Sequence, residues 1–265
     1  MATRVEDRVT ARPVSAKSGG MVGLGRLAGS EMRLMRREPG ILWVIALPIL
    51  LSVVFGLIPG TSTPSPDVGG GRFIDFYVPV LVCFVIAMMA LNVVASALGT
   101  YRERGVLRRL AVTPVRPATL LLAQGLVSFT ILIGVVAAMV LITGLAFHVP
   151  MPKQVFGFLL ALVLAVASMF SIGLLVAALA PTGRAANGIG TVVMFPSVFF
   201  AGLWTPGPMM SDTIRGISEW TPLGAGSQAI QEAWMGTFPS LFHLAVPLGY
   251  TLVIGWVAVK KFRWE

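Results

Sequence analysis

The segment Tyr101–Pro117, YRERGVLRRLAVTPVRP, concentrates a quarter of the basic residues of the chain. Its charged side chains are Arg102, Glu103, Arg104, Arg108, Arg109 and Arg116. Guanidinium and carboxylate groups form charge-assisted hydrogen bonds, so this set points to charge pairing and not to covalent chemistry. A long uncharged run lies on each side of the segment. The simplest role for its arginines is therefore to hold a loop on the cytoplasmic side of a membrane.

Residue sets that carry catalytic, nucleotide or metal chemistry are missing from the sequence. A Walker A loop requires Gly-Lys-[Ser/Thr], whereas Lys17-Ser18 follows Ala16. The chain has no His-Glu-x-x-His, no Cys cluster and no Gly-x-Ser-x-Gly elbow. His148 and His243 stand alone near the ends of apolar runs. We therefore predict no catalytic residue and no metal or cofactor bound by this chain.

The composition indicates that lipid surrounds most of the chain. Only 12% of the 265 residues are charged and the mean hydropathy is +0.85, whereas soluble domains carry about 25% charged residues. The net charge of +9 would suit a nucleic-acid partner. However, the basic residues sit between apolar runs and form no continuous face, so we expect no nucleic-acid binding.

Six uncharged intervals are long enough for a helix to cross a hydrocarbon core of about 30 Å. The predicted spans are Ile41–Ile58, Phe76–Gly99, Ala118–Phe147, Val155–Ala180, Ala186–Trp204 and Leu241–Val259. Their apolar residues run continuously, without the alternation that a transmembrane strand requires. The sequence thus predicts an all-α membrane protein with six transmembrane helices in residues 21–265, behind a cytoplasmic tail at residues 1–20.

The basic residues also predict the orientation of these spans. With the N-terminus in the cytoplasm, seventeen of the twenty Lys and Arg residues fall on the cytoplasmic side, and only Arg72, Lys153 and Arg215 lie outside. Such an asymmetry is typical of multi-pass proteins of the cell membrane. We therefore expect a multi-pass protein of the cytoplasmic membrane with both termini in the cytoplasm.

Two segments that flank the spans have their own signatures. Residues 21–38 predict an amphipathic interfacial helix on the inner leaflet, with one apolar face and an opposite face of arginines that meets lipid headgroups. Those arginines are Arg26, Arg33, Arg36 and Arg37. The loop Thr205–Ser240 is rich in aromatic residues and proline and has four charged residues. It predicts short re-entrant helices at the outer leaflet, and a compact surface loop is the alternative.

The predicted spans lack Asp, Glu, Lys and Arg, which argues against a proton-driven pump or a charged channel filter. Several aromatic, methionine and amide side chains within the spans are candidates to line a path for a hydrophobic cargo. They are Phe84, Met88, Asn92, Phe195, Phe199 and Phe200. For each of them, simple packing between helices is the alternative.

The Arg-rich segment resembles the cytoplasmic segment of type-2 ABC transporter permeases, including the daunorubicin-resistance-like drug exporters. The motif appears here as Arg102-Glu103-Arg104-Gly105, Leu107-Arg108-Arg109-Leu110 and Thr113-Pro114. A second stretch is similar to the fifth span, outer helices and Pro-Leu turn of that family. It reads FPSVFFAGLWTPGPMM from Phe195 and EWTPLGAGSQAIQEAWMG from Glu219.

The resemblance implies a coupling helix between spans two and three that docks on a separate ABC ATPase subunit. The residues expected to contribute are Tyr101, Arg102, Glu103, Arg104, Gly105, Leu107, Arg108, Arg109, Leu110, Thr113 and Pro114. Leu107 and Leu110 would enter a cleft on the ATPase, while Arg104 and Arg108 would pair with its carboxylates. The alternative is that the arginines only retain the loop inside.

The resemblance also implies a cargo and partners. ATP and Mg²⁺ would bind to the ATPase subunit, and a second permease copy or a paralogue would complete the path. The expected cargo is a hydrophobic or amphipathic, drug-like or antibiotic-like small molecule, whose export would give resistance. Export of a lipid or glycan is the nearest alternative, and an independent secondary transporter is a further one.

Overall fold

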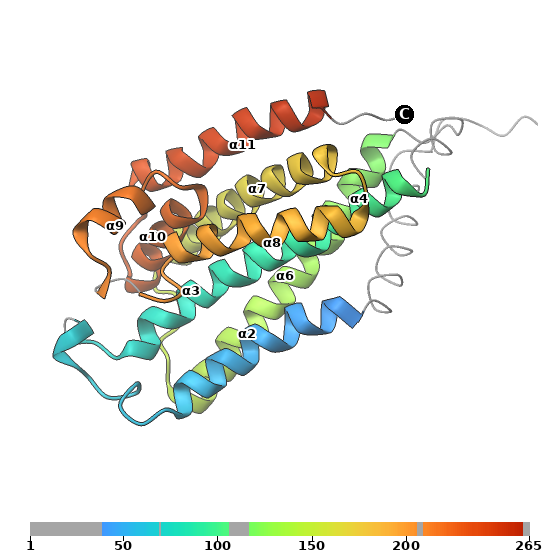
Figure 1. The fold of residues 1–265 in the computed structure, drawn as a ribbon. Coiled ribbons are helices and arrows are strands. Elements are labelled where there is room, and N and C mark those ends of the chain that lie inside the picture. The colour runs from blue at the N-terminus through green and yellow to red at the C-terminus, as the bar shows by residue number, and fades with distance from the viewer. Residues whose placement is uncertain (1–38, 69, 106–116, 206–208, 262–265) are drawn as a thin grey trace, which may run out of the picture.

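The computed structural model describes residues 39–68, 70–105, 117–205 and 209–261, and these ranges contain helices and no β-strand (Figure 1). The longer elements are α2 (Pro39–Leu57), α3 (Phe73–Met88), the π-helical turn η2 (Met89–Val94), α4 (Ala95–Glu103), α6 (Pro117–Phe147), α7 (Val155–Leu179), α8 (Gly183–Phe200) and α11 (Leu241–Lys261). The shorter ones are η1 (Pro66–Val68), α9 (Asp212–Ser218) and α10 (Pro222–Met235). The prediction of an all-α fold is confirmed for the described residues.

Each predicted span overlaps one long helix, but the count of six membrane spans is not reached. Four helices among the described residues are long and apolar enough to cross a membrane: Phe73–Glu103, Leu122–Phe147, Val155–Leu179 and Leu241–Lys261. Leu42–Leu57 is apolar but shorter. Helix α8 has 18 residues, including Arg184, Asn187 and three glycines, and does not reach the same hydropathy. Six spans therefore remain a prediction.

The fifth predicted interval, Ala186–Trp204, is displaced relative to its helix. Helix α8 begins three residues earlier, at Gly183, because the Thr182 hydroxyl accepts a hydrogen bond of 3.1 Å from the Ala185 amide and caps the first turn. The helix ends at Phe200, and Gly202 follows with a φ of +95°. Glycine adopts this left-handed conformation without steric cost, so the helix can stop there.

Successive long helices run in opposite directions, and α3, η2 and α4 form one continuous helix (Figure 1). We call the end where α4 and α11 finish the basic end, because it carries Arg102, Arg104, Arg184, Lys260 and Lys261. We call the opposite end, which holds α9 and α10, the loop end. Among the described residues, these five of the charges used to predict orientation therefore lie at one end of the bundle, and the orientation itself remains a prediction.

Helix α3 occupies the centre of the bundle. Every residue from Tyr77 to Ala87 is buried, and α2, α6, α7, α8 and α10 all pack against this continuous helix. A helix that is apolar on all sides must be surrounded by other helices or by lipid. The sequence of α3 has this character, and the structure surrounds it with protein.

The predicted loop Thr205–Ser240 contains two short helices, α9 and α10. Helix α10 begins at Pro222 behind a Thr221 cap and ends at Gly236, whose φ is +105°. Its small residues permit close packing, and a Cβ added to Gly226 would lie 2.9 Å from the Cβ of Ala165 on α7. Whether these helices re-enter the outer leaflet remains a prediction.

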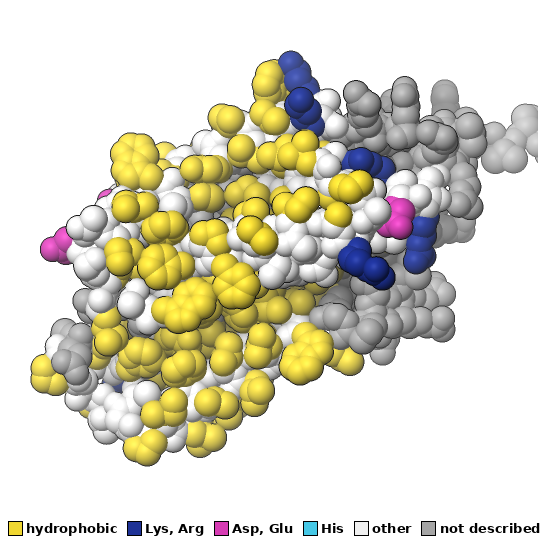
Figure 2. Space-filling view, in the orientation of Figure 1, with side chains coloured by type: hydrophobic (Ala, Val, Ile, Leu, Met, Phe, Trp, Pro, Cys, Tyr) yellow, Lys and Arg dark blue, Asp and Glu magenta, His cyan; other side chains and the backbone are white. Residues whose placement is uncertain are grey.

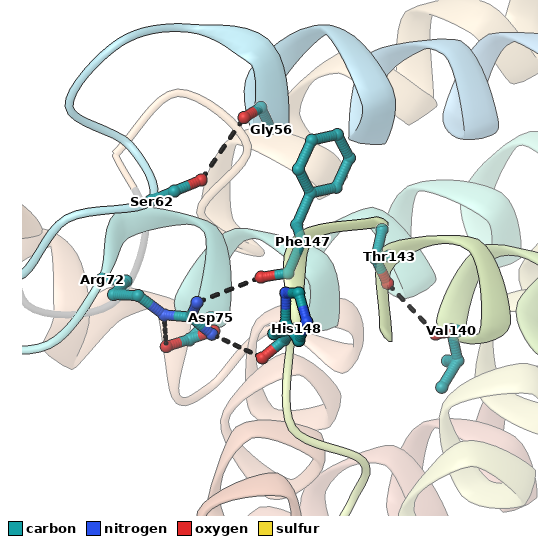
Figure 3. A network of polar contacts seen from close by, with 8 residues as sticks. All are labelled: Gly56, Ser62, Arg72, Asp75, Val140, Thr143, Phe147 and His148. Carbon is teal, nitrogen blue, oxygen red and sulfur yellow. Dashed lines mark hydrogen bonds and ion pairs between the residues drawn. The ribbon is translucent and has the colours of Figure 1, made fainter. Parts of the chain in front are cut away.

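A cluster of charged and backbone groups fastens the start of α3 to the end of α6 at the loop end (Figure 3). Arg72 binds both carboxylate oxygens of Asp75 at 2.9 and 2.7 Å, and it donates to the carbonyls of Phe147 and His148 at 3.0 and 2.8 Å. The chain leaves α6 through His148 with a φ of +54°. Because a guanidinium presents several donors in a fixed plane, one side chain can join the start of α3 to the end of α6.

We expect Arg72→Leu to lower the free energy of unfolding by about 2 kcal/mol, because it leaves Asp75 and two carbonyls without their donor in a partly buried place. Arg72→Lys keeps the charge but cannot bind both carboxylate oxygens, so its loss should be intermediate. The measurement is the thermal unfolding midpoint of the purified variants. Midpoints equal to that of the unmodified protein would show that this cluster does not stabilise the bundle.

Candidate functional site

The predicted ATPase-coupling residues divide into two groups in the structure. Tyr101 to Gly105 are described and lie at the end of α4 and just beyond it. The remaining residues of the set lie in residues 106–116, outside the described part of the chain. They are Leu107, Arg108, Arg109, Leu110, Thr113 and Pro114. The interfacial helix predicted at residues 21–38, with Arg26, Arg33, Arg36 and Arg37, is likewise outside the described residues.

Arg102 reaches from α4 to the end of α7. Its Nη1 atom donates to the carbonyl oxygens of Ala177 and Ala178 at 3.2 and 2.5 Å. The last carbonyls of a helix have no partner within the helix, and the helix dipole makes this terminus partially negative. A guanidinium group satisfies both features, so Arg102 fastens α4 to the C-terminus of α7.

Glu103 makes the complementary contact with the next helix. Its Oε2 atom accepts a hydrogen bond of 3.0 Å from the backbone amide of Gly183, the first residue of α8. Helix N-termini carry free N–H donors and a partial positive charge, so a carboxylate is the matching partner. Arg102 and Glu103 therefore hold the two sides of the turn between α7 and α8, and we call this set of contacts the α7–α8 clasp.

The clasp is reinforced by close backbone approach between α4 and α8. A Cβ on Gly183 would collide with the Thr100 hydroxyl and would lie 3.0 Å from the carbonyl oxygen of Ser96. Conversely, a Cβ on Gly99 would lie 3.0 Å from the Cα of Gly183. Only glycine permits this contact, so the end of α4 and the start of α8 form one tightly packed unit.

A second polar contact joins the middle of the bundle to α8. In the π-helical turn, the side-chain oxygen of Asn92 accepts from the Thr191 hydroxyl at 2.9 Å, and its Nδ2 contacts the Met194 sulfur at 3.1 Å. The same Thr191 hydroxyl lies 2.9 Å from the carbonyl oxygen of Asn187, one turn earlier in α8. Polar side chains between apolar helices fix their register.

The π-helical turn itself is covered by glycines from the two neighbouring helices. A Cβ on Gly173 of α7 would collide with the carbonyl oxygen of Ala90, and a Cβ on Gly190 of α8 would collide with that of Leu91. Single π turns frequently occur at functional positions of helices. Here the turn lets α7 and α8 approach the backbone of the central helix and presents Asn92 to Thr191.

The six candidate path residues form two groups. Phe84, Met88 and Asn92 follow one another at four-residue spacing along α3 and η2, where Phe84 is buried and the other two are partly buried. Phe195 and Phe199 lie on α8, with ring centroids 6.5 and 6.3 Å from that of Trp204, and Phe199 also meets Phe200 edge to face. Of the three residues on α3 and η2, only Asn92 has a described side-chain hydrogen bond to α8.

The aromatic group on α8 belongs to a wider apolar surface. The Phe195 side chain is 54% exposed. Figure 2 shows apolar side chains over much of the face that α2 and α8 present. Exposed apolar side chains on a bundle of this kind contact lipid, another protein or an apolar cargo. The roles of all six residues as path residues remain predictions.

The internal roles of Arg102 and Glu103 were missed by the sequence interpretation, which assigned both to docking on a partner. Their carbonyl and amide partners lie about 75 to 80 positions further along the chain. The sequence Ala180-Pro181-Thr182-Gly183 did contain a usable signal for the start of α8, because its threonine can cap a helix that begins at Gly183. A docking role for the same residues remains a prediction.

The chain is similar to a known protein family. The model of the ABC-2 type transporter family matches residues 24–234, from the segment before α2 to the end region of α10. No curated protein sequence matches the chain. The matched region includes the α7–α8 clasp, the π-helical turn and both helices of the loop end.

Proposed function

Because the chain belongs to the ABC-2 type transporter family, we propose that it is the permease subunit of an ATP-driven exporter served by a separate ABC ATPase. The chain is a membrane protein and a transport permease. Members of this family normally work with an ABC ATPase subunit. In the proposed complex, ATP and Mg²⁺ bind to that subunit, and a second copy of the permease or a paralogue completes the path.

The observation that carries the proposal is the position of the α7–α8 clasp. Arg102 and Glu103 lie four and three residues before residues 106–116, the segment proposed to dock on the ATPase. A displacement of this segment acts on the end of α4 and on the start of α6, between which it lies. Because the clasp fastens α4 to the end of α7 and the start of α8, those helices must follow or the hydrogen bonds must break.

Helix α8 would carry this displacement along the bundle. It leads from the clasp at Gly183 through Thr191, which is bonded to Asn92, to the aromatic group around Phe199. Packed helices shift as units and do not deform continuously. ATP-dependent movement at the basic end can therefore alter the surface that α8 and η2 present to a cargo.

The proposed cargo is a hydrophobic or amphipathic small molecule of the drug or antibiotic class, moved out across the cytoplasmic membrane. The support is the apolar surface of α8 and the mixed aromatic and amide character of the candidate path residues. An exported lipid or glycan is the alternative within the family. A secondary transporter is the alternative outside it, and its energy source would be an ion gradient.

Transport by inside-out vesicles separates ATP-driven export of an amphiphile from secondary transport. The vesicles contain the permease and a candidate ABC ATPase that co-purifies with it, and the measurement is the accumulation of a fluorescent amphiphilic amine. We expect accumulation with ATP and Mg²⁺, and none with ATP alone, without the ATPase, or with a proton or sodium gradient in place of ATP. Accumulation that follows the gradient without the ATPase would overturn the proposal in favour of secondary transport.

A further inference from the structure

An apolar groove of about 460 Å³ lies between α6 and α7, and we call it the α6–α7 groove. Among the described residues these two helices hardly contact each other, and both pack instead against the central helix formed by α3 and η2. The wall residues lie within residues 133–141 of α6 and 155–162 of α7, together with Met151 and Pro152 of the connection. All of them are apolar, unlike the wall of the polar cavity at the loop end, which includes Asp212, Arg215 and Gln228.

The α6–α7 groove has a buried floor and an exposed rim. Val136 and Leu162 belong to the floor and are only 5% and 1% exposed. Leu141, Met151 and Leu159 form the rim and are between 47% and 61% exposed. Both helices are candidate membrane spans, so the rim faces hydrocarbon and not water. The partner that covers this groove is therefore itself apolar over the length of the groove.

The length of the groove indicates which apolar partner fits it. The wall on α6 runs from residue 133 to residue 141, which is about 12 Å at a rise of 1.5 Å per residue. One leaflet supplies about half of a hydrocarbon core that is about 30 Å thick. A lipid chain from the leaflet at the loop end matches this length. A transmembrane helix of another protein would instead continue across the whole core, well beyond the groove.

Lys153 follows the wall residue Pro152 and brings a positive charge to the loop-end side of the groove. Its backbone amide donates to the carbonyl of Trp234 at 3.3 Å, which fixes the connection against α10. Its aliphatic stem lies beside Gly236, because a Cβ built on that glycine would lie 3.3 Å from the Cβ and Cδ atoms of Lys153. The ion pairs of the described residues do not include its ammonium group.

The nearby C-terminus of α10 does not require this ammonium group. Lysine side chains often bind the last carbonyls of a helix. Here the carbonyls of Glu232, Ala233 and Trp234 already accept from backbone amides, two of which belong to Lys153 and Gln154. The two carboxylate oxygens of Glu232 are also occupied, by a backbone amide at 2.7 Å and an imidazole at 2.8 Å. The charge of Lys153 is therefore left for a partner outside the described chain.

We propose that the α6–α7 groove binds an anionic phospholipid, with one acyl chain along the groove and the headgroup phosphate at Lys153. The apolar wall matches the chain, and the ammonium group matches the negative charge at the level of the headgroups. A lysine can reach this level while its methylene groups stay against the protein. The lipid is a resident component of the permease and not its cargo, so this site goes beyond the proposed function.

The same features disfavour a molecule of the proposed cargo class as the occupant. An amphiphilic amine would fill the groove with its apolar part, but its positive charge would meet Lys153. Zwitterionic lipids carry a phosphate together with an ammonium group, so the attraction to Lys153 is partly cancelled. Like charges act against the first class and weaken the second, which leaves anionic lipid as the matching class.

The test places a fluorescent label beside the groove in lipid nanodiscs. Bimane is attached to Leu145→Cys, because Leu145 is 74% exposed and lies one turn beyond Leu141, outside the wall, whereas the native Cys83 is buried. The discs contain phosphatidylcholine with either brominated phosphatidylglycerol or brominated phosphatidylcholine at equal mole fraction. Bromine quenches the label only at short range. We expect phosphatidylglycerol to be preferred about fivefold, as one basic residue near a headgroup provides.

Three variants assign this preference to the groove and its lysine. Lys153→Gln should abolish the preference, whereas Lys153→Arg keeps the charge and should retain it. Ala137→Phe places a ring in the groove from an exposed wall position, and it should lower the quenching by either lipid because the chain is displaced. The matched control is Lys260→Gln, which removes a lysine that lies over Trp256 at the basic end and should change nothing. Thermal midpoints verify that each variant is folded.

Equal quenching by the two brominated lipids, or a preference that persists in Lys153→Gln, would overturn the proposal. Quenching by neither lipid would overturn it too, because protein such as a second copy of the chain would then cover the groove. A loss of the preference in Lys260→Gln would show an effect of total charge and not of this site. The discs contain no ATPase, so each result leaves ATP-driven export to be judged by the vesicle measurement.

Discussion

Glu103→Ala is expected to reduce ATP-driven transport about tenfold while the permease still binds its ATPase. The substitution removes the acceptor for the Gly183 amide and so releases the start of α8 from α4. Loss of a hydrogen bond of this kind at a helix N-terminus costs about 0.5 to 2 kcal/mol. A tenfold change corresponds to about 1.4 kcal/mol. The measurement is the initial rate of cargo accumulation in vesicles, with the amount of bound ATPase determined in parallel.

Glu103→Gln is the matched control for this prediction. Its side-chain carbonyl can still accept from Gly183, but it carries no charge for a partner. If the internal hydrogen bond matters, Glu103→Gln should lower the initial rate of cargo accumulation by less than about threefold, because the bond is weakened and not removed. If Gln behaves like Ala and both variants also release the ATPase, Glu103 acts through its charge at the partner and the role of the clasp in transmission is wrong.

Gly190→Ala is expected to destabilise the bundle by about 3 kcal/mol or to prevent its folding. The new methyl group would collide with the carbonyl oxygen of Leu91 in the π-helical turn. That carbonyl belongs to the central helix, which other helices surround, so the backbone cannot move away without losing packing elsewhere. Added volume in a packed core costs about 1 to 3 kcal/mol, and a backbone neighbour leaves the least room for adjustment.

Gly188→Ala provides the control two residues earlier in the same helix. A Cβ at this position meets no atom within 4 Å among the described residues, and Gly188 is exposed. Alanine is the better helix former, so the thermal midpoint should be unchanged or higher. The measurement is the fraction of monodisperse protein in size-exclusion chromatography after heating. Equal midpoints for Gly190→Ala and the unmodified protein would show that the contact between α8 and η2 is not tight.

The sequence was sufficient to predict where the long helices lie. Uncharged runs of about 20 residues follow from the cost of polar groups in hydrocarbon, and this rule does not depend on tertiary contacts. It works less well for α8, where Thr182 and Gly183 start the helix ahead of Arg184. Because Arg184 lies in the first turn, the predicted interval begins too late, at Ala186, whereas capping and not hydropathy decides where this helix begins.

The π-helical turn could not be predicted in this way. It is covered by Gly173 and Gly190, which lie roughly 80 to 100 positions away in the sequence and come close only in the folded bundle. Asn92 was selected as a rare polar residue in a span, and the structure gives it partners in Thr191 and Met194. The residue type was therefore informative, whereas its partners depended on tertiary packing.

The same limit applies to charged groups. Glu103 was interpreted from its neighbours in the sequence, yet its described partner is a backbone amide at the start of another helix. Asp212, Arg215 and Gln228 lie in a segment that was predicted only as short helices, and they face one cavity because α9 and α10 pack against each other. Spacing along the chain does not reveal partners that are brought together by the turns between helices.

The central claim is that a separate ATPase drives this permease through residues 101–114, and co-purification of the two proteins tests it most directly. The tagged permease is co-expressed and extracted with candidate ABC ATPase subunits, and the bound ATPase and its ATP turnover are measured. We expect Arg108→Glu to release the ATPase and to abolish stimulated turnover, while Arg26→Glu in the predicted interfacial helix retains both. An unmodified permease that binds no ATPase, or an Arg108→Glu variant that binds and stimulates it fully, would contradict the account.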